Sequence, residues 1–297
     1  MINDLNGLII LNKPAGVGSL DTIRRLKKKF PDLSKTGFLG TLDPMATGVL
    51  PLFTGLSTKL IPFIRNNPKV YRLKIRFGIA TDSYDCTGKV TKTALVDPDL
   101  LNQQIIGDLL SGFLGEIDQV PPPLSACKSK GKRAYDLFFS GQPVTLPSRK
   151  KEIYEIDFKG FFPGENPEAE LVVSCESGTY MRSLAVDIGN KVNLPAHLSY
   201  LCRLSCGDFL ISEAVGLETL LEQGLEKYLE PPDRFLPYPE VIITENSTYF
   251  QLVKNGNQLK NIWNVPDGLI KIKDNRQNLL AIYKSRGNFL AAAKVLL

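Results

Sequence analysis

One aspartate lies at the centre of the densest local chemistry in this chain. Asp43 belongs to the segment GTLDPMATG, residues 40–48. The following Pro44 disfavours helical backbone at Asp43, so the carboxylate is predicted on a turn flanked by two glycines, where it is available for chemistry. Aspartate before proline is also typical of a helix N-cap with proline at the first helical position, and this structural interpretation stays open.

Two further residues suit an anion or a nucleic-acid base. Arg182 ends the segment SGTYMR, residues 177–182, which opens a predicted helix. An arginine in a first helical turn opposes the helix dipole by about 0.3 to 1 kcal/mol, so it is better explained if it faces a carboxylate or a phosphate. A solvated side chain is the alternative. Tyr71, within the basic segment KVYRLK, is either a stacking platform beside phosphate ligands or a core aromatic.

The elements that must position these residues follow from hydrophobic periodicity. Residues 7–12 form a short apolar run that predicts a buried strand. Ser19 is expected to cap a helix whose apolar positions are Leu20, Ile23, Leu26 and Phe30. Lysines 27–29 in its last turns favour the dipole, and we expect either a solvated cationic end or contact with phosphates.

Further along the chain the pattern alternates between strands and helices. Strands are predicted at 70–77, 152–158 and 170–174, and helices at 101–114, with start signals at 97–99, and at 180–192. Residues 128–133, KSKGKR, read as a basic loop. The proline-rich segment 231–239 is the best predicted linker and places a domain boundary near residue 240.

Composition describes an ordinary soluble protein. The length of 297 residues predicts two domains, or one large domain with an appendage. The residues are 43% hydrophobic and 23% charged, and the mean hydropathy is -0.05, so we expect no general disorder. The absence of a long apolar stretch and of a basic leader predicts a cytoplasmic protein without a membrane span. The five cysteines are expected as free thiols. Cys202, Cys206 and His197 could be three metal ligands, but their spacing does not favour a zinc site, and we expect no metal.

Charge is strongly segregated along the chain. The net charge is +9 over residues 1–80, 0 over 81–150, -9 over 151–240 and +5 over 241–297. Two basic ends around an acidic stretch can direct a polyanion such as nucleic acid to one face. Solvated charges without a partner are the alternative.

Taken together and in this order, the segments resemble the TruB family of pseudouridine synthases. The resemblance rests on Lys13-Pro14 after an apolar strand, GTLDPMATG around Asp43, KVYR around Tyr71, TDSYD at 81–85, GTYMR ending at Arg182 and LCRL at 201–204. It covers most of residues 7–210, and its motifs are specific in combination. It implies an enzyme that isomerises the uridine at position 55, in the T loop of tRNA, to pseudouridine.

The resemblance also implies roles for individual residues and a fold. Asp43 matches the nucleophile, Tyr71 the residue stacked on a flipped uracil, and Arg182 the partner of the aspartate. Tyr180 and Leu201 match positions that line the uracil pocket, and Lys13 is expected to bind substrate. The implied fold is mixed α+β, with a catalytic domain around a largely antiparallel sheet (residues 1–240) and a small β-rich PUA-like domain (residues 241–297).

One position departs from the family pattern. The family often has histidine five residues before the nucleophile, where this chain has Phe38. Phe38 keeps an aromatic substrate contact but removes a hydrogen bond to RNA. A non-catalytic RNA-binding or tRNA-chaperone protein with the same fold is therefore the alternative function, and a synthase for another RNA is a second one.

The implied reaction suits these residues. Isomerisation breaks the bond from ribose to N1, turns the uracil ring and rejoins it through C5, without redox change or group transfer. No cofactor is therefore expected, one nucleophilic carboxylate suffices, and Arg182 is the counter-charge that keeps it ionised. Stacking on Tyr71 would return about 1 to 3 kcal/mol of the free energy that base flipping costs. The expected partner is the T arm of tRNA, bound by a monomer without an obligate protein partner.

Overall fold

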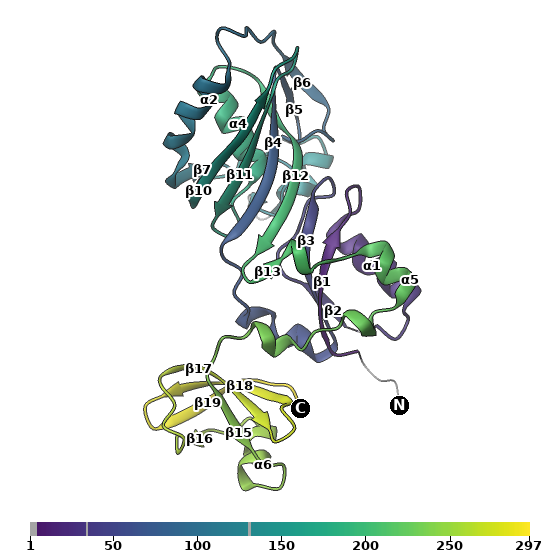
Figure 1. The fold of residues 1–297 in the computed structure, drawn as a ribbon, viewed down its shortest axis with the longest axis vertical. Helices are drawn as coiled ribbons and strands as arrows, with labels where there is room; N and C mark the ends of the chain where they lie inside the picture. The colour runs from purple at the N-terminus through teal and green to yellow at the C-terminus, as the bar shows by residue number, and fades with distance from the viewer. Residues whose placement is uncertain (1–4, 34, 130–131) are drawn as a thin grey trace.

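The structure is a computed structural model, and it describes residues 5–33, 35–129 and 132–297. The molecule is elongated, with a large sheet that carries most of the chain and a smaller sheet at the C-terminal end (Figure 1). No helix within the described ranges is both long and apolar enough to cross a membrane.

The large sheet has ten strands, most of them antiparallel to their neighbours. Its order is β14-β1-β3-β12-β4-β11-β10-β7, with β2 paired to β3 and β13 paired to β12. Only the β1–β14 and β12–β3 pairs are parallel. The bounds are β1 Gly7–Lys13, β2 Thr36–Phe38, β3 Thr47–Thr54, β4 Lys69–Phe77, β7 Gly115–Gln119, β10 Arg149–Phe162, β11 Glu168–Cys175, β12 Ala196–Cys206, β13 Phe209–Leu210 and β14 Val215–Gly216. The predicted α+β fold around a largely antiparallel sheet is confirmed.

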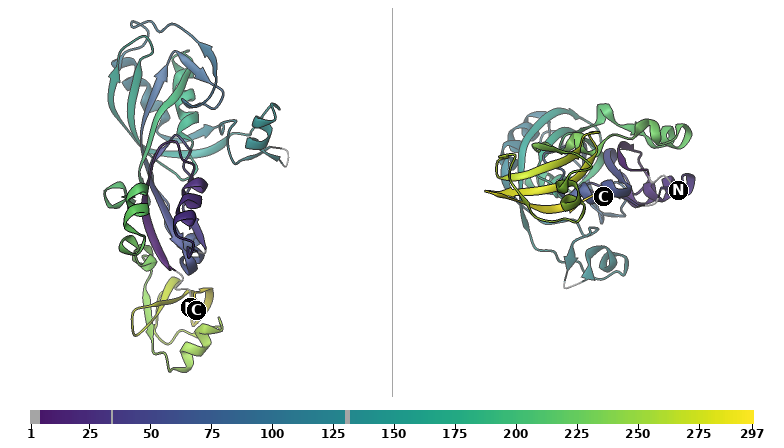
Figure 2. Two further views of the ribbon diagram at one scale, coloured as in Figure 1. Left: turned by 90° about the vertical axis from the view of Figure 1, so that its right-hand side faces the viewer. Right: turned by 90° about the horizontal axis from the view of Figure 1, so that it is seen from below.

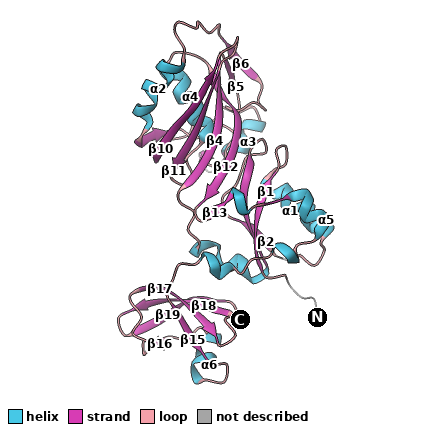
Figure 3. Cartoon of the chain, in the orientation of Figure 1, coloured by secondary structure: helices cyan, strands magenta, loops and turns pink. Residues whose placement is uncertain are grey.

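Helices α1, α2, α4 and α5 pack their apolar side chains into one core cluster on this sheet. The helical segments, coloured cyan in Figure 3, are α1 Ser19–Lys29, α2 Gln103–Leu110, α3 Ala134–Phe139, α4 Met181–Lys191, α5 Leu217–Gln223, α6 Thr248–Lys254, and the 3-10 turns Gly55–Phe63, Ser111–Phe113, Ile211–Glu213, Glu226–Tyr228 and Pro232–Phe235. In β4 the residues alternate, so that Tyr71, Leu73 and Ile75 face this core. Arg72, Lys74 and Arg76 lie on the opposite face, as the period-2 pattern predicts.

Two small hairpins extend from the large sheet. Strands β5 (Ile79–Thr81) and β6 (Val90–Thr93) form one, and β8 (Lys128–Ser129) and β9 (Lys132–Arg133) form the other. We refer to β8, β9 and α3 as the arm, which projects from the body of the molecule in both views of Figure 2. The predicted basic loop at 128–133 falls here, and its residues 130 and 131 lie outside the described residues.

The smaller sheet has the order β15-β17-β18-β19-β16 and its own core. The strands are β15 Glu240–Ile243, β16 Leu259–Lys260, β17 Gly268–Asp274, β18 Leu279–Arg286 and β19 Phe289–Val295. The segment before it was expected to be a linker. Instead Phe235 and Leu236 are buried in a core cluster that also contains Phe53 and Ile282, so this segment packs the two sheets together.

Two predicted helix starts are wrong. The N-cap of α1 is Gly18, not Ser19, and Leu20 is exposed. The second helix begins after Asn102, whose side chain accepts hydrogen bonds from the backbone N–H groups of Gln104 and Ile105. The acidic residues at 97–99 therefore do not cap it, because a better-placed Asx side chain satisfies the first turn.

Candidate active site

Asp43 lies on a turn between β2 and β3, not at a helix terminus. The backbone N–H of Ala46 donates to the carbonyl of Asp43 at 3.1 Å, which closes the turn. Ser19 holds the preceding residue, since its Oγ donates to the carbonyl of Leu42 at 2.9 Å and accepts from the Leu42 N–H at 3.0 Å. The N-cap interpretation of Asp43 is wrong, because no helix follows Pro44 and the side chain has another partner.

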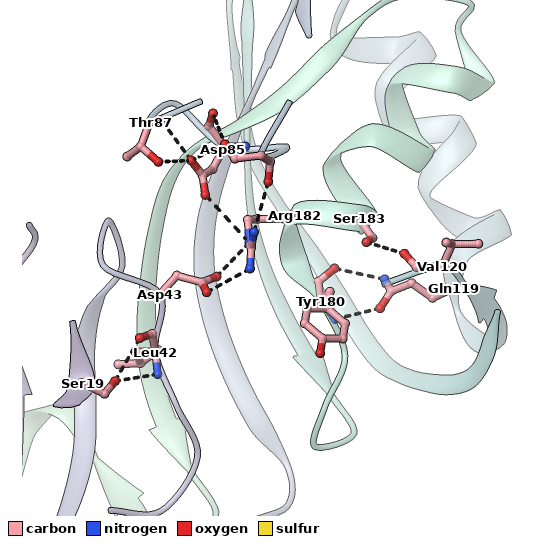
Figure 4. Close-up of polar contacts among 11 residues, drawn as sticks. Ser19, Leu42, Asp43, Asp85, Thr87, Gln119, Val120, Tyr180, Arg182 and Ser183 are labelled. Carbon is pink, nitrogen blue, oxygen red and sulfur yellow. Dashed lines mark hydrogen bonds and ion pairs between the residues drawn. The ribbon is translucent and has the colours of Figure 1, made fainter. Parts of the chain in front are cut away.

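That partner is Arg182, at the first turn of α4. Its Nε donates to Asp43 Oδ2 at 2.9 Å and its Nη2 donates to Asp43 Oδ1 at 3.0 Å (Figure 4). This bidentate geometry fixes both oxygens of the carboxylate. The Arg182 side chain is only 4% exposed, whereas Asp43 is 34% exposed. The solvated alternative for Arg182 is therefore wrong, and Asp43 is the member of the pair that solvent and substrate can reach.

A second carboxylate holds the other side of the arginine. Asp85 Oδ2 lies 3.9 Å from Arg182 Nε. Its Oδ1 accepts from Ser83 Oγ at 2.9 Å, from the Thr87 N–H at 2.9 Å and from Thr87 Oγ1 at 2.6 Å. Arg182 Nη1 also donates to the carbonyl of Ser83 at 3.1 Å. Asp85 ends the TDSYD segment of the family resemblance, in which no role was expected for it. In the structure Asp85 is only 3% exposed and lies beside the Arg182 guanidinium, which indicates that it helps to position the arginine.

Tyr71 is buried, at 7% exposure, in the same core cluster as Leu42 and Leu201. Its burial raises its pKa to about 12, so its hydroxyl is neutral at physiological pH. The core interpretation of Tyr71 is thus correct. It does not exclude stacking, because this cluster adjoins both ends of the Asp43–Arg182 pair through Leu42 and Met181.

Arg203 donates hydrogen bonds to the backbone on both sides of Asp43, at Gly40 and at Val49. Its Nε donates to the carbonyl of Val49 at 2.7 Å and its Nη2 to that of Gly40 at 2.9 Å. A side chain on Gly48 is not possible, because φ is +102° and a Cβ would lie 2.2 Å from the carbonyl oxygen of Arg203. Arg203 is fully buried and stands directly opposite Tyr71 in the β12–β4 pair. Arg203 belongs to the segment LCRL, which is part of the family resemblance, but the sequence alone predicted no function for this arginine.

Lys13 fastens the same segment from β1. Its Nζ donates to the carbonyls of Pro14 at 2.7 Å, Val17 at 2.7 Å and Pro44 at 3.2 Å. The side chain is fully buried, and this burial lowers its pKa to about 8. Since its three donors are used within the protein, Lys13 positions the Asp43 turn instead of reaching substrate as expected.

The other predicted substrate residues lie around this centre. Leu201 is buried at 5% exposure, and its carbonyl accepts from Thr47 Oγ1 at 3.3 Å. Tyr180 precedes α4, and its backbone exchanges hydrogen bonds with the Gln119 amide at 2.7 and 3.0 Å. The Tyr180 hydroxyl lies 3.4 Å from Cys127 Sγ. Phe38, half-buried in β2, packs on the main core cluster.

The residues weighed as metal ligands have other contacts. His197 Nδ1 lies 2.8 Å from the carbonyl of Ile79, and Cys202 and Cys206 are free thiols. In the part of the chain that the structure describes, no three His, Cys, Asp or Glu side chains are grouped so as to hold a metal.

Comparison with known proteins agrees with this geometry. Residues 27–181 match the model of the TruB family pseudouridylate synthase N-terminal domain. The chain belongs to the TruB family. TruB-family relatives include "tRNA pseudouridine synthase B" of Clostridium tetani (strain Massachusetts / E88), which is 40% identical over 86% of each chain. The protein of the same name from Caldanaerobacter subterraneus subsp. tengcongensis is 35% identical over 95% of this chain and 96% of the relative.

Solved structures show the same fold as this TruB-family chain. A Cbf5–Nop10–Gar1 complex matches with a TM-score of 0.69 at 24% identity, covering 98% of this chain and 85% of the other. An H/ACA ribonucleoprotein bound to a substrate RNA containing 2'-deoxyuridine matches with a TM-score of 0.67 at 23% identity, over 98% and 85%. The coverage includes the C-terminal β-rich region, so the two-sheet architecture is shared.

Proposed function

We propose that this protein is a tRNA pseudouridine synthase that isomerises the uridine at position 55, in the T loop of tRNA. The observation that carries the proposal is the Asp43–Arg182 pair, in which a buried guanidinium holds a partly exposed carboxylate by two hydrogen bonds. The family and the names of the relatives at 40% and 35% identity support the same activity.

The pair suits a reaction that needs one nucleophile and no redox change. Asp43 attacks the bound nucleotide, and the bond between ribose C1' and N1 breaks. After the ring has turned, C5 bonds to C1' and the bond to Asp43 breaks. C5 then loses its proton and N1 gains one, so the product is an isomer of the substrate and Asp43 is regenerated. Arg182 keeps Asp43 charged and oriented for the attack, which is the usual requirement for an activated carboxylate. Asp85 in turn keeps Arg182 in place.

The base must leave its stack to reach Asp43. We assign stacking on the flipped uracil to Tyr71 and the lining of its pocket to Leu201, Tyr180 and Phe38. The position of Tyr71 supports this role, since it lies in a strand paired on both sides and its side chain packs in the core cluster that contains Leu42 and Met181. Aromatic stacking contributes about 1 to 3 kcal/mol per base, which offsets much of the cost of flipping.

We further propose a division of the chain at residue 240, with residues 1–240 as the catalytic domain and 241–297 as a PUA-like RNA-binding domain. The separate sheet and core of the C-terminal region support this division, and its net charge of +5 suits RNA. The T arm of tRNA is the proposed partner, bound by a monomer in the cytoplasm without an obligate protein partner.

Asp43→Asn tests the assignment. The variant keeps the shape of the side chain but removes its charge, so we expect pseudouridine formation in a tRNA transcript to fall by at least about 10⁴-fold. The dissociation constant for tRNA should stay within about threefold, because phosphate contacts dominate affinity. Turnover at the wild-type rate would refute the proposal. Absence of turnover in the wild-type protein would favour the non-catalytic alternative, and mapping of the modified site distinguishes position 55 from other positions.

A further inference from the structure

A basic groove lies between α1 and α5, away from Asp43. It is open, has a volume of about 550 Å³ and is lined by Arg25, Lys28, Lys29, Leu221 and Glu222. The three cations belong to α1 and have the spacing i, i+3 and i+4, so they share one face of the helix. The Ile23 and Leu26 side chains are buried on the other face, which holds the groove in a fixed orientation.

The two lysines of the groove form no ion pair with any residue that the structure describes. Arg25 is paired with Glu218 of α5 at 2.8 Å. Lys28 and Lys29 are exposed, and among the described residues neither has a carboxylate within 4.0 Å. Glu222 is the one acidic residue in the lining. The groove therefore presents the ammonium groups of Lys28 and Lys29 to a ligand from outside, and Glu222 offsets part of their charge.

The position of the groove is coupled to the active site. Ser19, the first residue of α1, exchanges two hydrogen bonds with Leu42, which precedes Asp43. At about 1.5 Å per residue, Lys28 and Lys29 lie about 14 to 15 Å along the helix from that anchor. In the side view of Figure 2, α1 and the arm lie on the same side of the large sheet.

We propose that the α1–α5 groove binds backbone phosphates of the tRNA substrate through Lys28 and Lys29. Lysine ammonium groups bind phosphates as point charges and carry no base specificity, so this contact fixes the orientation of the RNA and does not select its sequence. The inference rests on the proposed function, because it takes the RNA at Asp43 to be the ligand. It assigns to the basic end of α1 a role beyond favourable interaction with the helix dipole.

The test is the salt dependence of tRNA binding by the full-length Lys28→Ala/Lys29→Ala variant. Each lost phosphate contact reduces the slope of log K against log salt by about 0.7 to 0.9. We therefore expect the slope to fall by about 1.4 to 1.8 and the dissociation constant to rise about tenfold near 0.1 M salt. Single-turnover pseudouridine formation with protein below its dissociation constant should fall about tenfold, in proportion to the lost binding.

The matched control is Lys92→Ala/Lys191→Ala. It removes the same charge, and Lys191 occupies the last turn of α4 as Lys28 and Lys29 occupy that of α1. An unchanged slope in the groove variant, or an equal change in both variants, would overturn the proposal, as would a loss of thermal stability alone. Wild-type turnover tests the proposed function separately, because the slope measures binding whether or not pseudouridine forms.

Discussion

Two groups of charged side chains hold the segment that carries Asp43. The charges of one group are balanced by opposite charges, and those of the other by backbone carbonyl groups. In the first, which we call the carboxylate cluster, Asp43 and Asp85 surround Arg182 and the charges are of opposite sign. In the second, the cation cluster, Lys13 and Arg203 are fully buried and donate to backbone carbonyls. Lys69 also belongs to this cluster. Its pKa is lowered mainly because the side chain is buried, and to a smaller extent because the positive charge of Arg203 is near.

The difference separates two tasks. The cation cluster holds the backbone at Gly40, Pro44 and Val49, so the Asp43 turn has one conformation. The carboxylate cluster holds the side chain of Asp43 by two hydrogen bonds from Arg182. Carbonyl dipoles can compensate a buried cation without adding a second carboxylate to the site. The carboxylate of Asp43 therefore stays accessible among groups that are otherwise buried.

After Asp43→Asn, the largest effect is expected from Arg182→Ala, which removes the centre of the carboxylate cluster. Asp43 and Asp85 then lie close together without a counter-charge, and the nucleophile loses its orientation. We expect single-turnover pseudouridine formation to fall by at least about 10³-fold, with tRNA affinity within about threefold. Arg182→Lys is the control, since it keeps the charge but not the bidentate geometry, and it should recover only part of the rate. A wild-type rate in Arg182→Ala would contradict the assigned role.

The next effect is expected from Arg203→Met, which acts on the backbone. The carbonyls of Gly40 and Val49 each lose a donor, at a cost of about 1 to 3 kcal/mol per buried group. Urea unfolding should show a loss of about 3 kcal/mol, and the rate should fall because the Asp43 turn is no longer fixed. A large loss of rate with full stability would mean that Arg203 acts on the substrate, and the division of tasks between the clusters would be wrong.

A smaller effect is expected from Asp85→Asn. The amide keeps the size of the side chain and can still accept from Thr87, but it removes one charge beside Arg182. Because the bidentate pair with Asp43 remains, we expect the single-turnover rate to fall only about tenfold, with little change in the dissociation constant for tRNA. A loss as large as that of Arg182→Ala would show that Asp85 shares the function of the arginine.

The smallest effect concerns Asp187, an acidic residue of α4. Unlike the charged groups of the two clusters, its pKa is shifted by burial alone, with no contribution from a neighbouring charge. Burial alone raises its pKa to about 6. Between about pH 4 and pH 6 the folded state holds a proton that the unfolded state releases, so this group lowers stability as pH rises through that window. Asp187→Asn should therefore be more stable than the wild type at pH 7.5, by about 1 kcal/mol after allowance for solvent screening. Urea unfolding at pH 4 should show no such difference, and an equal gain at both pH values would contradict the ionisation argument.

The sequence carried a large part of the fold because its signals are local. Alternation of apolar and basic residues predicted β4, and helical spacing of Ile23 and Leu26 predicted α1. The sequence predicted helix starts less well, because the residue that caps a helix can depend on a contact with a distant part of the chain. Ser19 has a good N-cap side chain, but its hydroxyl is used by Leu42, which lies 23 residues away.

The sequence by itself determined which side chains are available: one aspartate on a proline turn, one arginine at a helix start and a resemblance that connects them. The tertiary structure decided what each of them does. Asp43 and Arg182 are 139 residues apart, and their pairing depends on the order of strands in the large sheet. The same long-range packing turned Lys13 from an expected substrate ligand into a support and brought Asp85 to the arginine. Periodicity and turn chemistry act over a few residues, whereas the charge and exposure of a site depend on contacts between strands far apart in the chain.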